Sequence, residues 1–423
     1  MKPRVIGLSD GANFYYSCEL AFDPSLKDRP VIVLSNNDGC AIARSEAAKK
    51  LGIKTGSPFH LIRDIVERHG VRVFSSNYTL YADLSRRVVE TYEEFSPIVE
   101  VYSIDESFLE FTGVRNYERH VRDMRKAVLR RTGIPVRVGL GPTKVLSKVS
   151  NEIAKKNEIF GGVLDIGRPS VADWLLPMMP VGDVCGIGPR TQHKLVALGV
   201  HTAADLRDMP LRQARSAGTV VLERIVLELQ GEACIEMEEV EPRRKGMAVT
   251  RSAGSPMTNL DTVISALTAH ATRAAEKLRQ HGLVTGSLTA FFHTNRRRPD
   301  RPQHSGSRTA KLVPMSNDTL DLVRAATRCA RAAWPKDQRG YGYTKAGVIL
   351  DDLLSEEERP LTLFDRPRER SADLMKALDE VNDRHGKKTL VLASEGFRRS
   401  WALRSEHRSP RYTTRISDLP VVR

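Results

Sequence analysis

The sequence predicts an α+β fold of several domains, and three observations support this fold class. Short β-rich runs alternate with segments of helical periodicity up to about residue 168, which indicates a sheet covered by helices. Residues 169–242 then have the pattern of short helices joined by short loops. Further strand-like runs flank helices between residues 243 and 352, and an Arg-rich tail follows at 353–423. A chain of 423 residues is long enough for about two to four domains.

The individual elements follow from the spacing of apolar residues. Short apolar runs bounded by polar residues predict strands at 5–10, 29–36, 71–77 and 134–141. Apolar positions at helical spacing predict helices at 13–22, 41–51, 81–95, 117–132 and 142–157. In the later part, strands are expected at 286–294 and 345–353, with helices at about 259–280 and 317–333.

Basic residues outnumber acidic residues in this chain. Lys and Arg total 66 against 52 Asp and Glu, a formal net charge of +14. This excess favours a polyanionic partner, nucleic acid before an anionic membrane surface, and a basic protein without such a partner is the alternative. The sequence has no long apolar run and no signal peptide, so a membrane-spanning or exported protein is not expected. Five widely spaced cysteines without a CxxC pair predict reduced thiols in the cytoplasm, with neither a disulfide framework nor a zinc site.

The run VYSIDESFLEF, residues 101–111, is the most unusual local feature. Alternating residues on both sides predict a β-hairpin whose two-residue turn is Asp105-Glu106. Such a turn favours residues that adopt positive φ, and two adjacent carboxylates repel each other. A turn sequence that departs from this preference without stabilising the fold is typical of a functional site. For the pair in isolation, a solvated hairpin tip is the favoured alternative.

A third carboxylate, Asp10, ends the first predicted strand. Carboxylate oxygens are the ligands that Mg²⁺ prefers, and Mg²⁺ keeps positions for phosphate and water. Asp10, Asp105 and Glu106, with the backbone carbonyl of Gly11, therefore form a candidate site for two Mg²⁺ ions. One ion would lower the pKa of a primer 3′-hydroxyl, and the other would hold the triphosphate and the leaving pyrophosphate.

Several segments of the chain resemble the Y-family translesion DNA polymerases, in particular their UmuC branch, the catalytic subunit of DNA polymerase V. They are DGANFYYSCE (10–19), SNNDGCAIARSEAAKKLGIKTG (35–56), FSSNYTLYADLSRRV (74–88), YSIDESF (102–108), VCGIGPRTQHKLVALGV (184–200) and SPRYTTRISDL (409–419). The resemblance covers almost the whole chain. In this family the metal ligands match Asp10, Asp105 and Glu106.

The resemblance implies a right-hand polymerase with palm, small fingers, helical thumb and α+β little finger. The expected limits are 1–23 and 78–168 for the palm, 24–77 for the fingers, 169–242 for the thumb, 243–352 for the little finger and 353–423 for a partner-binding tail.

The family also carries an aromatic steric gate below the sugar 2′ position of the incoming nucleotide. The matching residue here is Tyr15, which follows Phe14 in NFYYSCE. A ring packed against C2′ leaves no space for a hydroxyl group and so rejects ribonucleotides. Ordinary core packing is the alternative for both rings. Tyr16 departs from the small residue that relatives carry after the gate.

Cations are expected around the triphosphate. Lys49 matches a cation of the family's fingers helix, and Lys155 matches its palm lysine. Arg44 is a second candidate in the fingers. Glu46 would repel phosphate, so its side chain is expected to point away from the nucleotide. A solvated lysine on a helix surface is the alternative for Lys49 and Lys155.

CGIGPRTQHKLVALGV resembles a helix-hairpin-helix of the thumb. Gly186 and Gly188 would let backbone N–H groups approach a DNA phosphate, and Arg190 and Lys194 add positive charge. Such contacts position DNA without reading its sequence. A packing unit of two helices is the alternative. Arg251, in the segment that matches the first strand of the little finger, is a further DNA-binding candidate.

RPLTLFDRP, residues 359–367, is expected to be a docking peptide in the tail. Leu361, Leu363 and Phe364 resemble the sliding-clamp motif QLxLF, with Pro360 in place of the glutamine. A tail packed on its own domain is the alternative. The resemblance further implies a UmuD-like dimer and a RecA filament as partners, besides primer-template DNA and dNTPs.

These features predict an error-prone, template-directed DNA polymerase that bypasses damaged bases in the bacterial SOS response. We expect it in the cytoplasm, associated with the nucleoid when active, with no membrane partner. Two alternatives remain at this point. One is a catalytically inactive DNA-binding paralogue that acts through partner contacts, and the other is a cyclase or nuclease built on a similar palm.

Overall fold

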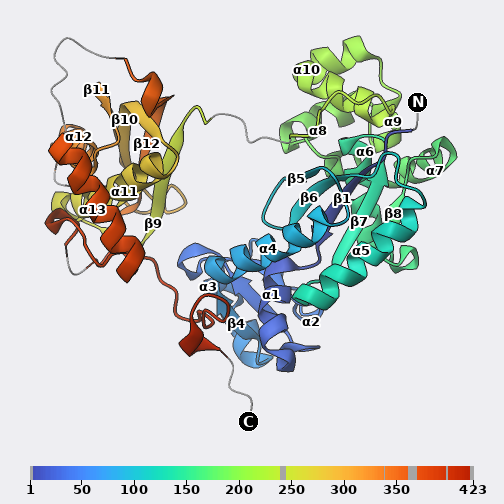
Figure 1. Ribbon diagram of the computed structural model, residues 1–423, viewed down its shortest axis with the longest axis horizontal. Coiled ribbons are helices and arrows are strands. Elements are labelled where there is room, and N and C mark those ends of the chain that lie inside the picture. Colours follow the sequence, from blue (N-terminus) through green and yellow to red (C-terminus); the bar gives the residue numbers. More distant parts are fainter. Residues whose placement is uncertain (1–2, 239–243, 338, 361–368, 397–398, 420–423) are drawn as a thin grey trace. The chain divides into compact units, whose positions relative to one another are not determined.

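The computed structural model describes residues 3–238, 244–337, 339–360, 369–396 and 399–419. The chain divides into two compact units (Figure 1). Unit 1 draws on residues 1–35, 39–241 and 407–423, and unit 2 draws on residues 36–38 and 242–406. The last part of the chain therefore belongs to the same unit as the first.

Unit 1 is organised around a five-stranded sheet in the order β5-β6-β1-β7-β8. The strands are β1 (Ile6–Gly11), β5 (Val99–Val101), β6 (Glu106–Glu110), β7 (Val136–Gly141) and β8 (Val163–Asp165). The central strand β1 is antiparallel to both of its neighbours. Helix α6 (Lys144–Lys156) packs so closely on β7 that a Cβ at Gly139 would lie 2.1 Å from the backbone nitrogen of Asn151. This close approach brings the lysines of α6 next to the sheet.

The larger helices of unit 1 belong to two groups, one packed on this sheet and one packed on α6. Helices α1 (Phe14–Phe22), α4 (Tyr78–Glu93) and α5 (Tyr117–Thr132) share a hydrophobic core with the sheet. Four helices follow in the region predicted to be helical: α7 (Pro169–Leu175), α8 (Pro189–Ala197), α9 (Ala203–Arg207) and α10 (Leu211–Leu229), the last of them interrupted at Gly218 and Thr219. They pack on α6 through a second core.

A smaller sheet in unit 1 has the order β3-β2-β4. It consists of β2 (Val31–Leu34), β3 (Ala41–Arg44) and β4 (Arg72–Ser75), with α2 (Glu46–Lys50) and α3 (Phe59–Arg68) beside it. The helix predicted over 41–51 was wrong for its first four residues, because these pair antiparallel with β2. Ser45 separates the two elements: its hydroxyl accepts the N–H of Ala48 and so caps α2.

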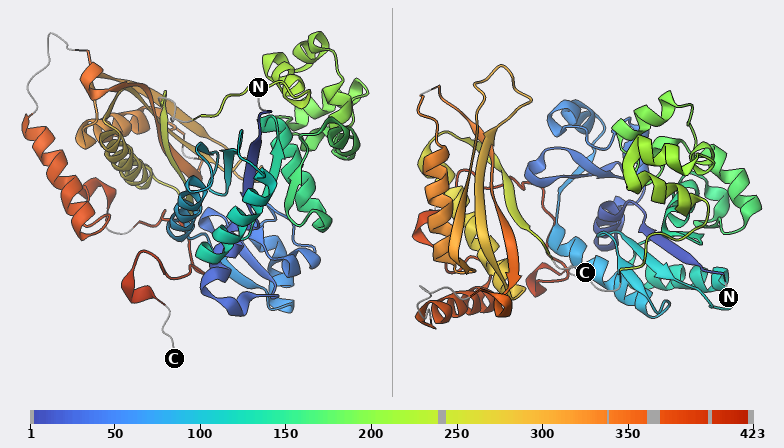
Figure 2. Two further views of the ribbon diagram at one scale, coloured as in Figure 1. Left: turned by 45° about the vertical axis from the view of Figure 1, so that its right-hand side comes forward. Right: turned by 90° about the horizontal axis from the view of Figure 1, so that it is seen from above.

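Unit 2 contains a four-stranded antiparallel sheet in the order β11-β10-β12-β9 (Figure 2). The strands are β9 (Met247–Met257), β10 (Leu283–Thr294), β11 (Ser305–Ser316) and β12 (Tyr343–Ser355). Helices α11 (Leu260–Gln280) and α12 (Thr319–Ala333) form one core with the sheet, and α13 (Glu369–His385) follows. The predicted strands and helices are confirmed here, but β11 and α13 were not predicted. In β11 the first half is mostly polar and exposed, and the short apolar run 312–315 contains Pro314, which argues against a strand.

None of the helices in the described ranges combines the length and apolar character needed to cross a membrane.

Candidate active site

The predicted carboxylates lie at one end of the central sheet of unit 1. Asp10, near the end of β1, is directly opposite Glu106 of β6 and Arg137 of β7. Opposed residues of antiparallel strands project from the same face of a sheet. Glu106, Asp10 and Arg137 therefore form a row across three neighbouring strands. The N–H of Gly11 donates to the backbone carbonyl of Asp105 at 2.9 Å, which places Asp105 beside this row.

The hairpin that carries Asp105 and Glu106 differs from the predicted one. Glu106 is already paired within β6, so the connection spans residues 102–105 and is not a two-residue turn. Neither carboxylate residue has a positive φ. The hydroxyl of Ser103 accepts the N–H groups of Asp105 at 3.3 Å and Glu106 at 3.0 Å, and it donates to Asp105 Oδ1 at 2.7 Å. The predicted turn was wrong because a serine side chain stabilises a longer connection.

Two lysines of α6 pair with the carboxylates. Lys155 Nζ lies 2.9 Å from Asp10 Oδ2, and Lys148 Nζ lies 3.1 Å from Glu106 Oε2. Asp10 is only 8% exposed, and burial raises its pKa to about 6 although Lys155 lowers it. The charges of Glu106 and Asp105 raise the pKa of Asp10 further. The site thus concentrates negative charge that additional cations would stabilise.

The donor set fits a hard divalent cation, because such cations prefer carboxylate oxygens. In the part of the chain that the structure describes, no three Asp, Glu, His or Cys side chains are arranged as a metal site. Asp10 and Glu106 are paired with their lysines instead. A divalent cation would relieve the repulsion that raises the pKa of Asp10, so the chemistry of the residues is compatible with metal binding.

A cavity of about 440 Å³ opens beside these carboxylates. All residues predicted to bind the nucleotide line it: Phe14, Tyr15, Arg44, Lys49 and Lys155. Asp10, Gly11 and Asp105 belong to the same lining, whereas Glu106 does not. The structure therefore gathers residues from β1, α1, β3, α2 and α6 around one space next to the carboxylates.

Glu46 also lines this cavity, so the expectation that it points away was wrong. Its Oε1 lies 2.6 Å from Lys49 Nζ and accepts a hydrogen bond from Asn13 Nδ2 at 3.2 Å. The hydrogen bond with Lys49 is the largest cause of the lowered pKa of Glu46. The carboxylate stays in the lining because Lys49, one turn further along α2, balances its charge.

Arg137 is a cavity residue that the sequence reasoning missed. Its register opposite Asp10 was available only once the strands were paired. One signal was present in the sequence, because Arg137 is the single charged residue in the apolar run IPVRVGLG. Arg44 is also part of the cavity lining. Its guanidinium donates to the carbonyl of Ile53 at 2.8 Å, and its buried Nε has no partner in the described residues.

Tyr15 rests on a buried support that the sequence did not reveal. Its ring stacks on Tyr81 with centroids 4.8 Å apart and an interplanar angle of 23°. Tyr81 donates to Glu19 Oε1 at 2.6 Å, and Glu19 is only 1% exposed. Burial raises the pKa of Glu19, and the hydrogen bonds it accepts lower it. Burial also raises the pKa of Tyr15 to about 12, so its phenol stays protonated at neutral pH.

The support of Tyr15 continues into the last part of the chain. Ser409 Oγ donates to Glu19 Oε1 at 3.0 Å, and Asn77 Nδ2 donates to Ser409 Oγ at 2.9 Å. Tyr412 stacks on Phe22 with centroids 4.8 Å apart. Residues 407–412 therefore complete the packing around α1 and the start of α4.

The predicted thumb motif places its glycines and cations on the surface. Gly186 has φ +88° and Gly188 is the N-cap of α8, with no side chain bonded to the free N–H groups of the helix. All four of Gly186, Gly188, Arg190 and Lys194 are exposed. The element before the hairpin is only a short 3₁₀ turn at Val181–Asp183.

The remaining predicted sites lie in unit 2 and in the tail. Arg251 of β9 is exposed and lines a cavity beside α11. The clamp-binding candidates Leu361, Leu363 and Phe364 lie outside the described residues.

Comparison with known proteins identifies the family. The impB/mucB/samB family matches residues 9–152, and its C-terminal domain matches residues 244–363. The chain is 43% identical over 421 residues to the protein UmuC of Salmonella typhimurium, covering 98% of this chain and 99% of that protein. The chain belongs to the UmuC branch of the Y-family DNA polymerases.

Other relatives of this Y-family polymerase agree. The chain is 40% identical to the protein SamB of Salmonella typhimurium, over 99% of this chain and all of that protein. It is 30% identical to DNA polymerase IV of Moorella thermoacetica, over 90% of this chain and 94% of that protein. A solved Y-family DNA polymerase chimera covers 83% of this chain with 99% of its own, at a TM-score of 0.66 and 20% identity. The predicted multidomain polymerase fold is confirmed.

The predicted enzyme class and function are confirmed with the family. The protein is a translesion DNA polymerase of the UmuC type, whose error-prone synthesis belongs to the SOS response. Its catalysis is metal-dependent, as in this family of polymerases. The inactive-paralogue, cyclase and nuclease alternatives are therefore set aside. Residues 372–422 match a further family that is described only as a domain of unknown function.

Proposed function

We propose that the polymerase holds two Mg²⁺ ions on Asp10, Asp105 and Glu106, with the carbonyl of Gly11 as a further ligand. The observation that carries this proposal is the row of Asp10 and Glu106 across β1 and β6, with Asp105 held beside it at the mouth of a cationic cavity. When bound, the ions supply charge neutralisation for an in-line attack of the primer 3′-hydroxyl on the α-phosphate of a dNTP.

The chain's own cations bind and orient the triphosphate in this proposal. Lys155, Lys49, Arg44 and Arg137 approach the cavity from different elements, so a triphosphate would be held from several directions. In this structure Lys155 pairs with Asp10, and Lys49 pairs with Glu46. Exchange of these carboxylates for phosphate oxygens keeps both amines paired while the nucleotide is bound.

Metal dependence gives the direct test of this proposal. Chelation of divalent ions with EDTA is expected to stop primer extension on undamaged and lesion-containing templates, and added Mg²⁺ is expected to restore it. The reaction would be followed by gel separation of the extended primer. Extension at an unchanged rate in EDTA would contradict the metal assignment.

Tyr15 is proposed as the steric gate, with Phe14 beside it. Support comes from the position of Tyr15 in the cavity lining and from its stacking on the buried Tyr81. A ring held from below cannot easily move away from the sugar, so a 2′-hydroxyl would meet a fixed obstacle. Tyr81, Glu19 and Ser409 then act as positioning residues for the gate.

Replacement of Ser409 by Ala is expected to increase ribonucleotide incorporation several-fold and to lower the free energy of unfolding by about 1–3 kcal/mol. The reason is that Asn77 and Glu19 each lose a hydrogen bond in a buried setting. Nucleotide selectivity and thermal unfolding would both be measured. Ser417→Ala, at an exposed position, is the matched control. A destabilised variant with unchanged selectivity would show that Ser409 has only a structural role.

Primer-template DNA is proposed to contact both units. In unit 1 the exposed loop before α8 offers Gly186, Gly188, Arg190 and Lys194 to a phosphate. In unit 2 the sheet face opposite α11 and α12 carries hydroxyl and basic side chains, which suits a DNA backbone. Residues of this face include Thr250, Thr289, Ser307, Thr309, Lys311 and Lys345. Arg251 of the edge strand also remains a proposed DNA contact, but its register opposite the buried Ala346 places it on the α11 side of the sheet and not on this face.

The domain limits and partners also remain proposals. Palm, fingers, thumb, little finger and tail are assigned to 1–23 with 78–168, 24–77, 169–242, 243–352 and 353–423. A UmuD-like dimer, a RecA filament and a sliding clamp are the proposed protein partners, the clamp through Leu361, Leu363 and Phe364. A cytoplasmic location, with association to the nucleoid during synthesis, follows from the proposed work on DNA.

A further inference from the structure

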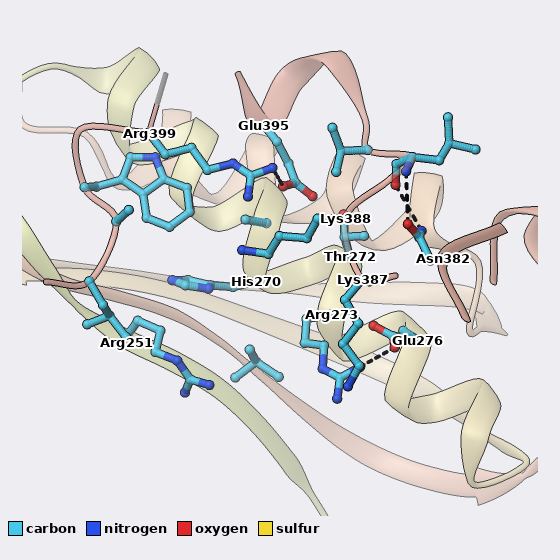
Figure 3. A pocket seen from close by; sticks show the side chains of 17 residues that line it. Arg251, His270, Thr272, Arg273, Glu276, Asn382, Lys387, Lys388, Glu395 and Arg399 are labelled. Atoms are coloured by element: carbon cyan, nitrogen blue, oxygen red, sulfur yellow. Dashed lines mark hydrogen bonds and ion pairs between the residues drawn. The ribbon is translucent and has the colours of Figure 1, made fainter. Parts of the chain in front are cut away.

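Unit 2 contains a cavity of about 470 Å³, and its lining shares no residue with the polymerase site (Figure 3). Strand β9, helix α11 and the segment after α13 enclose it. The third of these walls comes from the stretch 372–422, whose family is described only as a domain of unknown function. The volume lies within the range of about 300–1,000 Å³ that is usual for small-molecule sites.

The charged residues of this cavity are mostly basic. Five cations stand against two carboxylates: Arg251, Arg273, Lys387, Lys388 and Arg399 against Glu276 and Glu395. Both carboxylates form ion pairs within the lining: Arg273 pairs with Glu276, and Arg399 lies 2.6 Å from Glu395.

Three cations of the lining form no ion pair with any described residue. Within the described ranges, Arg251, Lys387 and Lys388 have no acidic partner, and Arg251 donates only to the backbone carbonyl of Thr250. Burial lowers the pKa of Lys388, the neighbouring Arg399 and Arg251 lower it further, and Glu395 opposes them in part. Cations that destabilise one another in this way create a local potential that attracts an anion.

A buried histidine at the bottom of the lining lacks a partner. His270 of α11 is 5% exposed, and its ring makes no hydrogen bond within the described residues. Figure 3 shows its ring near the amine of Lys388. Burial, Arg251 and Lys388 lower the pKa of His270 to about 4, so the neutral ring presents one N–H donor at neutral pH. Because His270 lines the cavity, this N–H can bind an acceptor that enters it.

Other lining groups indicate what the acceptor belongs to. Thr272 Oγ1 is a buried polar atom of the lining without a partner in the described part of the chain. The rest of the wall is largely apolar, with Val249, Ala269, Leu390, Val391 and Leu403. A cationic end with hydroxyl and imidazole donors, joined to apolar walls, fits a phosphate group on an organic body better than a bare ion.

We propose that this cavity is a binding site for a nucleotide phosphate, held by Arg251 and Lys388 with His270 as hydrogen-bond donor. The phosphate comes either from a free nucleotide or from a single DNA strand. In both cases the ligand joins residues 387–403 to α11 and β9. The site gives the C-terminal segment a ligand-dependent attachment to the body of unit 2, separate from the polymerase chemistry.

Trp401 offers a reporter for this site. Its ring lies edge-on to His270 with centroids 5.8 Å apart, and its Nε1 donates to Ser265 Oγ at 3.0 Å. The chain has three tryptophans, so the full-length protein labelled with fluorotryptophan should give three ¹⁹F resonances. Trp401→Phe identifies the resonance of interest. Work in EDTA suppresses metal-dependent nucleotide binding at the active site.

The titration uses pyrophosphate, ATP and a single-stranded oligothymidine as probes, with succinate as a dicarboxylate control. Pyrophosphate and ATP are expected to shift the Trp401 resonance, and Lys388→Gln should weaken both by about tenfold, the loss of one charge-assisted hydrogen bond. His270→Phe, which keeps a ring in place, should weaken them similarly. Lys376→Gln on α13, an exposed lysine outside this cavity, is the matched control.

The outcomes separate clearly. An oligothymidine effect equal to that of ATP assigns the phosphate to a DNA strand, and an effect of ATP alone assigns it to a free nucleotide. The proposal is overturned if no phosphate probe moves the Trp401 resonance at millimolar concentration. It is equally overturned if succinate acts as strongly as pyrophosphate, or if Lys376→Gln weakens binding as much as Lys388→Gln.

Discussion

Replacement of Asp105 by Asn is expected to reduce nucleotide addition by about 10³-fold or more while the fold and DNA binding persist. The amide has the same shape, and it can still accept the hydrogen bond that Ser103 donates to Asp105 Oδ1. The bond from Gly11 N–H goes to the backbone carbonyl of residue 105 and is not affected. What disappears is a negative charge beside Asp10 at the proposed metal site.

Single-turnover primer extension measures this loss, with thermal unfolding and fluorescence anisotropy on primer-template DNA as parallel measurements. Asp123→Asn is the matched control, because Asp123 is an exposed carboxylate on α5 that pairs only at the surface. An Asp105→Asn variant that extends primers like the wild type would remove Asp105 from the catalytic residues. A variant that fails to fold would show that the carboxylate is structural.

Replacement of Tyr15 by Ala is expected to raise ribonucleotide incorporation relative to deoxynucleotide incorporation by roughly 10²-fold. The change opens space where the sugar 2′ position is proposed to lie and leaves the carboxylates untouched. It also removes the stack on Tyr81, which should cost about 0.5–1.5 kcal/mol of stability. Comparison of kcat/KM for a dNTP and the matching rNTP measures the effect.

Tyr15→Phe is the internal control for the gate, because it keeps the ring and removes only the hydroxyl. We expect it to retain most of the discrimination against ribonucleotides. If Tyr15→Ala discriminates like the wild type, the ring is core packing and another residue excludes the 2′-hydroxyl. The Ser409→Ala effect on selectivity should then disappear as well.

Two of the three proposed metal ligands were accessible from sequence, because Asp10 lies near the end of one apolar strand and Glu106 begins another, and Asp105 directly precedes Glu106. A short apolar run located β1, period-two alternation located the β5–β6 hairpin, and a polar residue at a strand end stands out against its apolar neighbours. The turn itself was mispredicted. A serine hydroxyl that bonds two N–H groups leaves no mark beyond an ordinary serine, so Ser103 was not recognised.

Two other predictions, the helix over 41–44 and the direction of Glu46, were wrong because pairing with other residues decides both. Residues 41–44 suit a helix by composition, but pairing with β2 makes them a strand, and only the cap at Ser45 marks the change. The direction of Glu46 was inferred from its repulsion of phosphate alone. The ion pair with Lys49 balances the charge of Glu46, so Glu46 can stay in the cavity lining. Neither residue alone predicts that the two side chains pair.

The support of Tyr15 was beyond sequence reasoning for a different reason. Ser409 and Glu19 are 390 residues apart, and no periodic pattern links positions at that separation. Glu19 in a helix reads as a solvated side chain, yet it is buried and bonded to Tyr81. Such a group becomes recognisable only when residues 407–412 are placed against α1 and α4.

The attachment of residues 407–410 has a consequence for how the enzyme is made. The carboxylates, the cavity residues and the proposed gate are synthesised long before Ser409. Glu19 and Asn77 nevertheless form hydrogen bonds with Ser409. A chain terminated before it would enclose unsatisfied polar groups, each costing about 1–3 kcal/mol. A chain terminated before residue 409 would therefore lack these partners of Glu19 and Asn77, and Tyr15 would lose part of its buried support.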